Sequence, residues 1–147
     1  KKQIYIATDH AGFELKEIIK VYLIELGYSV LDMGAEVYKE DDDYPDYIRP
    51  CAETVAKDDS SFGIIFGGTG QGEAIVANKV TGIRTGVFCG GDLETVGLMR
   101  EHNNANILSI GARFVDEDEA RNAVKTFIET DFSEEERHIR RINKIEN

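Results

Sequence analysis

The chain has 147 residues, a formal net charge of −11 at pH 7, 41% hydrophobic residues and 31% charged residues. This length and composition are typical of one globular domain with its own core, and we expect neither a bilayer span nor a signal peptide. The excess of negative charge argues against binding to nucleic acid or to anionic membranes, since both would repel the chain. The two cysteines, Cys51 and Cys89, form no CxxC pair, which favours a reducing, cytoplasmic compartment.

Short apolar runs alternate with helical patterns from the N-terminus onward. The first half of the chain predicts strands over residues 4–7 and 28–31. Each strand is followed by a predicted helix, the first over residues 15–26 and the second from Pro45 or Pro50 to Ala56. Gly27 is the kind of residue that ends a helix. The start of the second helix stays open between the two prolines, because Pro50 would be awkward in a helix interior.

The second half repeats this alternation and adds a polar segment. It predicts strands over residues 62–66, 85–88 and 107–110. Between and after these strands it predicts helices over residues 73–79, 93–102, 117–129 and 133–144. This order predicts a three-layer, Rossmann-like or flavodoxin-like α/β sandwich with a five-stranded parallel sheet. Its ligand would lie at the carboxyl ends of the strands. We expect a single domain over 1–147, in which 133–147 is a helical arm that contacts a partner subunit.

A glycine-rich turn is the strongest local feature. The segment Gly67-Gly68-Thr69-Gly70-Gln71-Gly72 lies between a buried strand and a helix, where backbone N–H groups can converge on an anion. It lacks the Lys-Ser/Thr ending of a P-loop, and it does not follow the first strand as a dinucleotide fingerprint does. The turn could hold a phosphate or the oxyanion of an enediolate. A plain strand-to-helix turn is the alternative.

Several ionisable residues could serve a ligand site, each with an ordinary alternative role. Glu73 follows the turn and is either a base or a partner of the helix dipole, and Asp9-His10 either contact a ligand or cap a helix. His102 closes a helix and could be a simple charge partner there. The basic cluster 137–141 is either an anion site or a solvated helix face. The three histidines share no metal-ligand spacing, so we predict no metal.

Seven separated segments, in the same order, resemble the type B ribose-5-phosphate isomerase family, which also includes galactose-6-phosphate isomerase subunits and allose-phosphate isomerases. They are Thr8–Lys16, Asp43–Tyr47, Gly67–Lys79, Gly82–Arg84, Arg100–Asn106, Gly111–Arg113 and Arg137–Arg141. In one form of that family a cysteine at the position of Gly67 abstracts the substrate proton. In the other form a glutamate after the glycine turn does so. With Gly67 and Glu73, this chain is similar to the glutamate form.

The resemblance implies an aldose–ketose isomerase in which Glu73 moves a proton between C1 and C2 through an enediolate. His102 would assist ring opening, and Asp9 would hold sugar hydroxyls. The implied substrate-binding residues are His10, Gly67, Gly68, Thr69, Gly70, Gln71, Gly72, Asn103, Arg113, Arg137, His138 and Arg141. The resemblance also implies a cytoplasmic homodimer with shared active sites and no cofactor. Pairing of dimers into tetramers stays open.

The expected reaction converts D-ribose 5-phosphate to D-ribulose 5-phosphate. Residues 88–95 depart from the family pattern and follow the fourth strand, so they could line the sugar end of the pocket. Isomerisation of an allose, galactose or tetrose phosphate therefore stays open. A different class of function is a non-catalytic module that binds a sugar phosphate. The joint presence of Glu73, His102 and Asp9 argues against that alternative.

Overall fold

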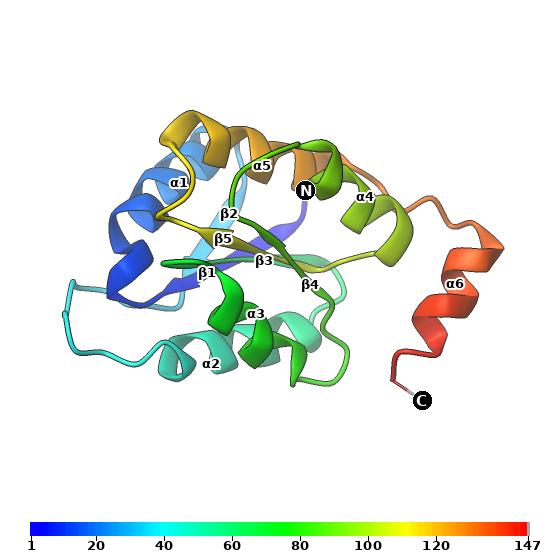
Figure 1. Cartoon of the computed structure of the whole chain (residues 1–147), viewed down its shortest axis with the longest axis horizontal. Helices are drawn as coiled ribbons and strands as arrows, with labels where there is room; N and C mark the ends of the chain where they lie inside the picture. Colours follow the sequence, from blue (N-terminus) through cyan, green and yellow to red (C-terminus); the bar gives the residue numbers. More distant parts are fainter. Residues whose placement is uncertain (147) are drawn as a thin grey trace.

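The protein is described by a computed structural model covering residues 1–146; Asn147, the last residue of the predicted arm, lies outside the described residues. One five-stranded, all-parallel sheet runs through it in the order β2-β1-β3-β5-β4 (Figure 1). The strands are β1 (Gln3–Thr8), β2 (Ser29–Asp32), β3 (Ser61–Gly67), β4 (Thr85–Phe88) and β5 (Ile107–Gly111). Every residue of central β3 is buried, as expected of a parallel strand covered on both faces.

Helices cover both faces of the sheet, so the predicted three-layer sandwich is confirmed. One layer contains α1 (Phe13–Glu25), α4 (Glu94–Asn103) and α5 (Glu117–Glu129), and the other contains α2 (Pro45–Ala56) and α3 (Gln71–Asn78) (Figure 1). Buried aromatic side chains such as Phe66, Phe88 and Phe127 fill the first interface, and Ile48, Val55 and Ile65 fill the second. Each such side chain contributes about 1.5–3 kcal/mol through burial. This packing makes the sheet a rigid support for the turns at its edges.

The structure decides the open start of α2 and moves the start of α3. Of the two possible starts of α2, Pro45 is correct, and Pro50 lies inside the helix. Pro45 is at the first helical position, where a missing N–H costs little. Pro50 and Asp46 are both exposed, so the Asp46 carbonyl that loses its helical donor can bond to water instead. The helix α3 begins at Gln71 rather than Glu73 and takes the end of the glycine segment into its first turn.

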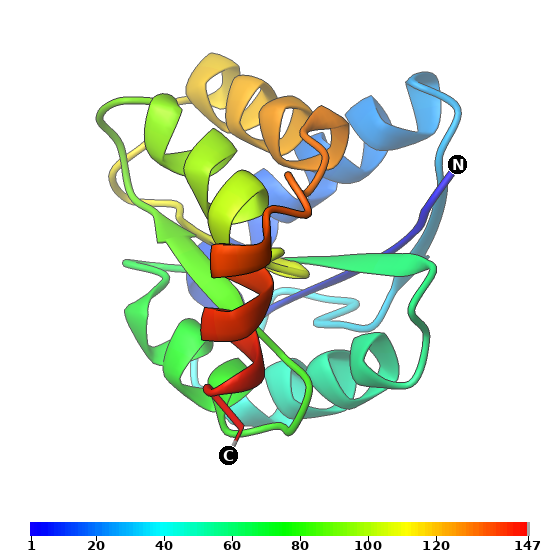
Figure 2. The ribbon, with the colours of Figure 1, turned by 90° about the vertical axis from the view of Figure 1, so that its right-hand side faces the viewer.

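The final helix, α6, spans Glu136–Asn143, shorter than the predicted 133–144. Glu134, just before it, has a φ of +59°, a left-handed conformation that interrupts helical geometry. The helix packs on the end of α4, and the Gly82 N–H donates to the Glu146 carboxylate at 2.9 Å. Because residue 82 precedes β4, α6 lies at the amino edge of the sheet, across which it runs in Figure 2.

No helix among residues 1–146 is both long and apolar enough to cross a membrane.

Candidate active site

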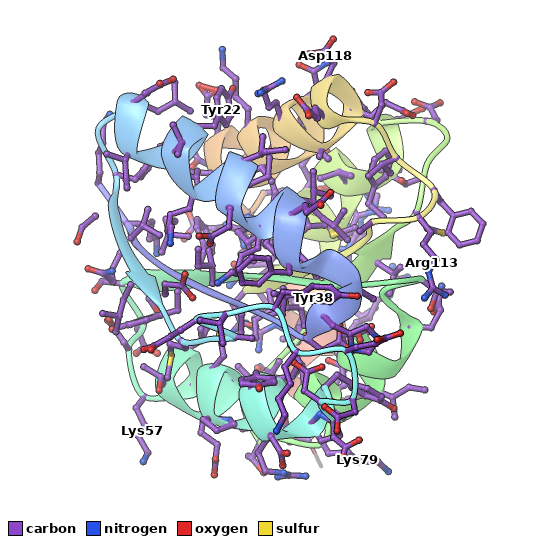
Figure 3. All side chains as sticks on the ribbon, turned by 90° about the vertical axis from the view of Figure 1, so that its left-hand side faces the viewer. Tyr22, Tyr38, Lys57, Lys79, Arg113 and Asp118 are labelled. Atoms are coloured by element: carbon purple, nitrogen blue, oxygen red, sulfur yellow. The ribbon has the colours of Figure 1, made fainter. Side chains whose placement is uncertain are left out.

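A cavity of about 330 Å³ opens at the carboxyl edge of the sheet, where a doubly wound fold is expected to bind its ligand. It is lined by Asp9, His10, Ala11, Tyr44, Gly68, Thr69, Gly72, Glu73 and Arg113. These residues come from the turns after β1, β3 and β5 and from the start of α2 and α3. Figure 3 views the molecule from this edge, with Arg113 projecting beside it. Six of the residues predicted from the sequence to form the site, together with Glu73, therefore meet in one cavity.

Glu73 lies inside this cavity although it is a charged residue on a helix. It is the third residue of α3 and only 4% exposed. Its carboxyl group lies directly against Gly67, the last residue of β3, so that a Cβ atom at position 67 would overlap the carboxyl carbon and both oxygens. The absence of a side chain at Gly67 therefore makes room for the carboxylate between the sheet and the helix.

The electrostatic environment of Glu73 makes it a stronger base than an exposed glutamate. Burial raises the pKa of the Glu73 carboxyl above its ordinary value, and the nearby charge of Asp9 adds to the rise. A hydrogen bond from its own backbone N–H acts in the opposite direction. Desolvation and a like charge both disfavour the ionised form. A carboxylate with such a pKa holds an abstracted proton more readily, which suits proton transfer next to a carbonyl.

The glycine turn is fixed by contacts to the neighbouring strand. Gly70 has a φ of +79° and immediately precedes α3, a conformation that glycine adopts at little cost. Its carbonyl accepts a hydrogen bond from Ser109 Oγ at 2.7 Å, and the carbonyl of Gly68 accepts one from the Arg113 N–H at 3.0 Å. The first N–H groups of a helix have no acceptor within it. The start of α3 therefore offers donors for an anion at the cavity.

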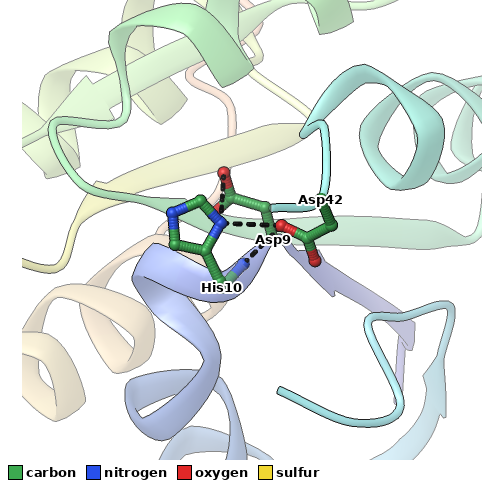
Figure 4. Close-up of side chains that lie close together, drawn as sticks. All are labelled: Asp9, His10 and Asp42. Carbon is green, nitrogen blue, oxygen red and sulfur yellow. Dashed lines mark hydrogen bonds and ion pairs between the residues drawn. The ribbon is translucent and has the colours of Figure 1, made fainter. Parts of the chain in front are cut away.

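Asp9 and His10 follow β1 and meet Asp42, which comes from the acidic loop between β2 and α2. Asp9 Oδ1 accepts a hydrogen bond from the Ala11 N–H at 3.0 Å, so Asp9 caps the short 3-10 helix His10–Gly12 and also lines the cavity. His10 Nδ1 lies 2.7 Å from Asp42 Oδ1 and 3.9 Å from Asp9 Oδ2 (Figure 4). The ligand-type atoms of these three residues lie within 4.8 Å of one another. The shortest distance in this cluster is the hydrogen bond between His10 and Asp42, so a bound cation is not needed to explain it.

Gly67, Gly70 and Gln71 belong to the glycine turn beside the cavity, whereas the predicted site residues of α4 and α6 lie at the opposite edge of the same chain. His102 and Asn103 end α4, and the Asn103 carbonyl accepts a hydrogen bond from Arg84 Nε, just before β4, at 3.0 Å. The imidazoles of His102 and His138 stack with ring centroids 4.4 Å apart and planes inclined by 17°. Arg137 and Arg141 lie on α6 beside them. A single chain therefore does not bring this group together with Glu73.

Tyr44, Ala11 and Asp42 lie at or beside the cavity, although no sequence pattern predicts a role for them. The ring of Tyr44 packs against Gly72, where a Cβ atom would come within 2.8 Å of it. Tyr44 directly precedes the proline that begins α2, and this position was the available signal for a residue held at the carboxyl edge. Within residues 1–146, none of residues 88–95 lines this cavity.

Comparisons with known proteins agree with this arrangement. A family model described as Ribose/Galactose Isomerase matches residues 4–145. The ribose-5-phosphate isomerase B of Mycolicibacterium paratuberculosis is 43% identical over 141 residues, which cover 96% of this chain and 87% of the relative.

Solved structures are similar over nearly the whole chain. The ribose-5-phosphate isomerase B of Mycoplasma genitalium with bound ribulose-5-phosphate has a TM-score of 0.93 and 38% identity, covering 99% of this chain and 94% of that one. The corresponding enzyme of Thermotoga maritima has a TM-score of 0.92 and 41% identity, covering 99% and 97%. These matches confirm the resemblance inferred from the seven segments and the prediction of an aldose–ketose isomerase. The chain belongs to the Ribose/Galactose Isomerase family.

Proposed function

We propose that the protein interconverts D-ribose 5-phosphate and D-ribulose 5-phosphate, with Glu73 as the base. The observation that carries the proposal is the buried Glu73 carboxylate, seated against Gly67 in a cavity bordered by the glycine turn. The relative from Mycoplasma genitalium binds ribulose-5-phosphate, the ketose of this pair. Both the base and the cavity lie where the fold presents its ligand edge.

The proposed reaction needs one base and no redox step. Glu73 removes the proton from C2 of the open-chain aldose phosphate, and the electron pair of that C–H bond forms the C1=C2 double bond of an enediolate. The negative charge gathers on O1. Glu73 then returns the proton to C1, while the O2 proton moves to O1 and O2 becomes the carbonyl oxygen. Backbone N–H groups of residues 68–72 stabilise the developing oxyanion.

The remaining residues of the cavity bind the rest of the substrate. Asp9 accepts hydrogen bonds from sugar hydroxyls, and His10 and Arg113 provide positive charge for the phosphate. A guanidinium can bind two phosphate oxygens at once through its planar fork. His10 and Asp9 come from the same turn, and Arg113 comes from the turn after β5. The substrate would thus lie across the carboxyl ends of β1, β3 and β5.

A second copy of the chain completes the site in this proposal. Ring opening and full phosphate binding are assigned to residues that lie at the amino edge, namely His102, Asn103, Arg137, His138 and Arg141. In a twofold dimer the same pair of surfaces meets twice, so each carboxyl edge can face the amino edge of its partner. Residues 1–147 would act as one domain, with 133–147 as the arm that contacts the partner. A cytoplasmic location remains a prediction.

The test is proton NMR of the purified protein with D-ribose 5-phosphate in heavy water. We expect ribulose 5-phosphate with deuterium at C1, because Glu73 exchanges its proton with solvent during the enediolate step. The Glu73→Gln variant keeps the size of the side chain and should bind substrate without turning it over. Turnover by that variant would exclude Glu73 as the base. If ribose 5-phosphate is unchanged, allose, galactose and tetrose phosphates are the next substrates, and failure with all of them would favour a binding module.

A further inference from the structure

We propose that Asp42 is a positioning residue of this site, which holds the His10 imidazole as a protonated Nε2–H donor toward the phosphate of the substrate. The proposal rests on the proposed function, since it assigns His10 to the phosphate. Asp42 belongs to the acidic loop between β2 and α2 and does not itself line the cavity.

Asp42 contacts His10 through both its backbone and its ring. One carboxylate oxygen, Oδ1, accepts a hydrogen bond from the His10 backbone N–H at 3.0 Å and lies 2.7 Å from ring Nδ1. The Asp42 side chain is only 4% exposed, whereas the His10 side chain is 28% exposed. Flanking Asp41 and Asp43 are exposed. The loop therefore directs one of its carboxylates inward, onto the turn that begins the site.

The hydrogen bond fixes which ring nitrogen carries a proton. An ionised carboxylate only accepts hydrogen bonds, so Nδ1 of His10 must be the donor. The second nitrogen, Nε2, points away from both carboxylates (Figure 4). If the ring is neutral, Nε2 is an acceptor that repels phosphate oxygens. If the ring is protonated, Nε2–H becomes a charged donor to them. Asp42 therefore favours phosphate binding only when the His10 ring is protonated.

The charged groups around His10 favour the protonated ring. Asp42 faces it from the acidic loop, Asp9 from the end of β1, and Arg113 from the turn after β5. The ring of Tyr38 makes an edge contact with a centroid distance of 6.3 Å. The hydrogen bond to Asp42 is the largest influence and raises the pKa of His10, partial burial and Arg113 lower it, and Asp9 adds to the rise. The net effect extends the cationic form of His10 toward neutral pH.

The test compares Asp42→Asn with wild type. Asparagine can still accept a hydrogen bond through its amide oxygen but carries no charge. Asp41→Asn is the matched control, because it removes the same charge from the adjacent, exposed position. The titration midpoint of His10 is followed by NMR of its ring Cε1–H and assigned with a His10→Gln variant among the three histidine signals.

We expect the His10 midpoint to lie above the ordinary value of about 6.5 in wild type and in Asp41→Asn, and to fall in Asp42→Asn. The KM for ribose 5-phosphate should rise roughly tenfold in Asp42→Asn at pH 8 and much less at pH 6, with kcat little changed, because only a charge-assisted hydrogen bond is lost. A KM increase of equal size at both pH values would indicate a merely structural role and overturn the proposal.

The titration needs no sugar and so separates this proposal from the proposed function. If wild type turns over no sugar phosphate, the proposed function fails, and inorganic phosphate becomes the probe. Weaker phosphate binding by Asp42→Asn than by Asp41→Asn would then still support the role of Asp42. A wild-type midpoint at or below the ordinary value would refute that role even if the Asp42 variant failed to fold.

Discussion

The carboxyl group of Glu73 fills the space that a side chain on Gly67 would occupy. Gly67 ends the central strand, and Glu73 lies six positions later in the first turn of α3. The intervening turn brings the chain back over the strand end and holds the carboxylate there, away from water. Position 67 must therefore stay a glycine for as long as Glu73 keeps this place.

The first prediction concerns Gly67→Ala. The added methyl group must displace the Glu73 carboxylate, and a misplacement of about 1 Å in a catalytic group can cost on the order of 100-fold in rate. We expect a loss of that order in kcat/KM and a destabilisation of about 1–3 kcal/mol from overpacking. Steady-state kinetics and urea unfolding measure the two effects. Gly97→Ala is the control, because position 97 of α4 has open space around it and should gain roughly 0.5–1 kcal/mol. Full activity in Gly67→Ala would contradict the packing described above.

The second prediction concerns stability and pH in Glu73→Gln. Burial raises the pKa of Glu73 in the folded protein above its ordinary value of 4.5, so the ionised carboxylate opposes folding once the pH exceeds that value. Glutamine carries no charge to desolvate. We expect Glu73→Gln to be inactive yet more stable than wild type at pH 8.

The gain should shrink as the pH falls toward 4, where Glu73 is protonated in both the folded and the unfolded state. Thermal unfolding at several pH values measures this difference. Glu53→Gln, at an exposed position of α2, should show no comparable pH-dependent gain. A Glu73→Gln variant less stable than wild type at every pH would mean that the carboxylate stabilises the fold.

The third prediction tests whether two chains share each site. Glu73 and His102 lie at opposite edges of the sheet, so Glu73→Gln and His102→Gln should each be inactive alone. Mixed and reassembled, they should regain roughly a quarter of wild-type activity, because random pairing in a twofold dimer leaves about that fraction of sites intact. Mixing Glu73→Gln with Asp9→Asn is the control and should regain nothing, since both changes fall on the carboxyl edge. No recovery in the first mixture would place the whole site within one chain.

The fourth prediction concerns the buried lysine Lys16. Its ammonium is fully buried, lies 2.6 and 2.8 Å from the Asp32 carboxylate oxygens and donates to the Ala35 carbonyl at 2.7 Å. Burial alone would raise the pKa of Asp32, but the hydrogen bonds from Lys16 and Lys20 lower it. Removing the buried partner leaves a charge poorly compensated, so Lys16→Met should lose about 3 kcal/mol at pH 7.

Urea unfolding measures that loss, and Lys20→Met is the control. Lys20 contacts the same carboxylate from a partly exposed position, and such a pair contributes about 1 kcal/mol or less. The loss in Lys16→Met should shrink in acid, since Asp32 stabilises the fold above its unfolded pKa and ceases to do so when it becomes protonated. Equal effects of the two substitutions would show that burial of Lys16 adds nothing.

The sequence predicted the strands to within one or two residues because buried parallel strands are continuous apolar runs between turn residues. It also placed Asp9 and Glu73 at one edge, since topology alone brings the carboxyl ends of parallel strands together, whereas Arg113 was implied only by the family resemblance. The contact between Asp42 and His10 was not predictable. It joins residues from two different loops. Neither a hydrophobic periodicity nor a sequence motif predicts the conformation of the acidic loop.

The sequence does carry a signal for the burial of Lys16. Lys16 shares a helix face with Ile19 and Leu23, so a charged residue occupied an apolar stripe and needed a partner. The boundary of α2 was harder to predict. A proline at position 50 is costly in general, and only the exposure of the neighbouring carbonyl makes it tolerable there.

The conflict between positions 67 and 73 also constrains how such a site can evolve. A cysteine introduced at position 67 would overlap the Glu73 carboxylate, and loss of Glu73 alone would remove the proposed base. With Glu73 as the proposed base, an exchange to a cysteine at position 67 would therefore need both substitutions, because either one alone displaces or removes that base. The close packing thus couples two positions that lie six residues apart, so that a change at either one constrains the residue allowed at the other.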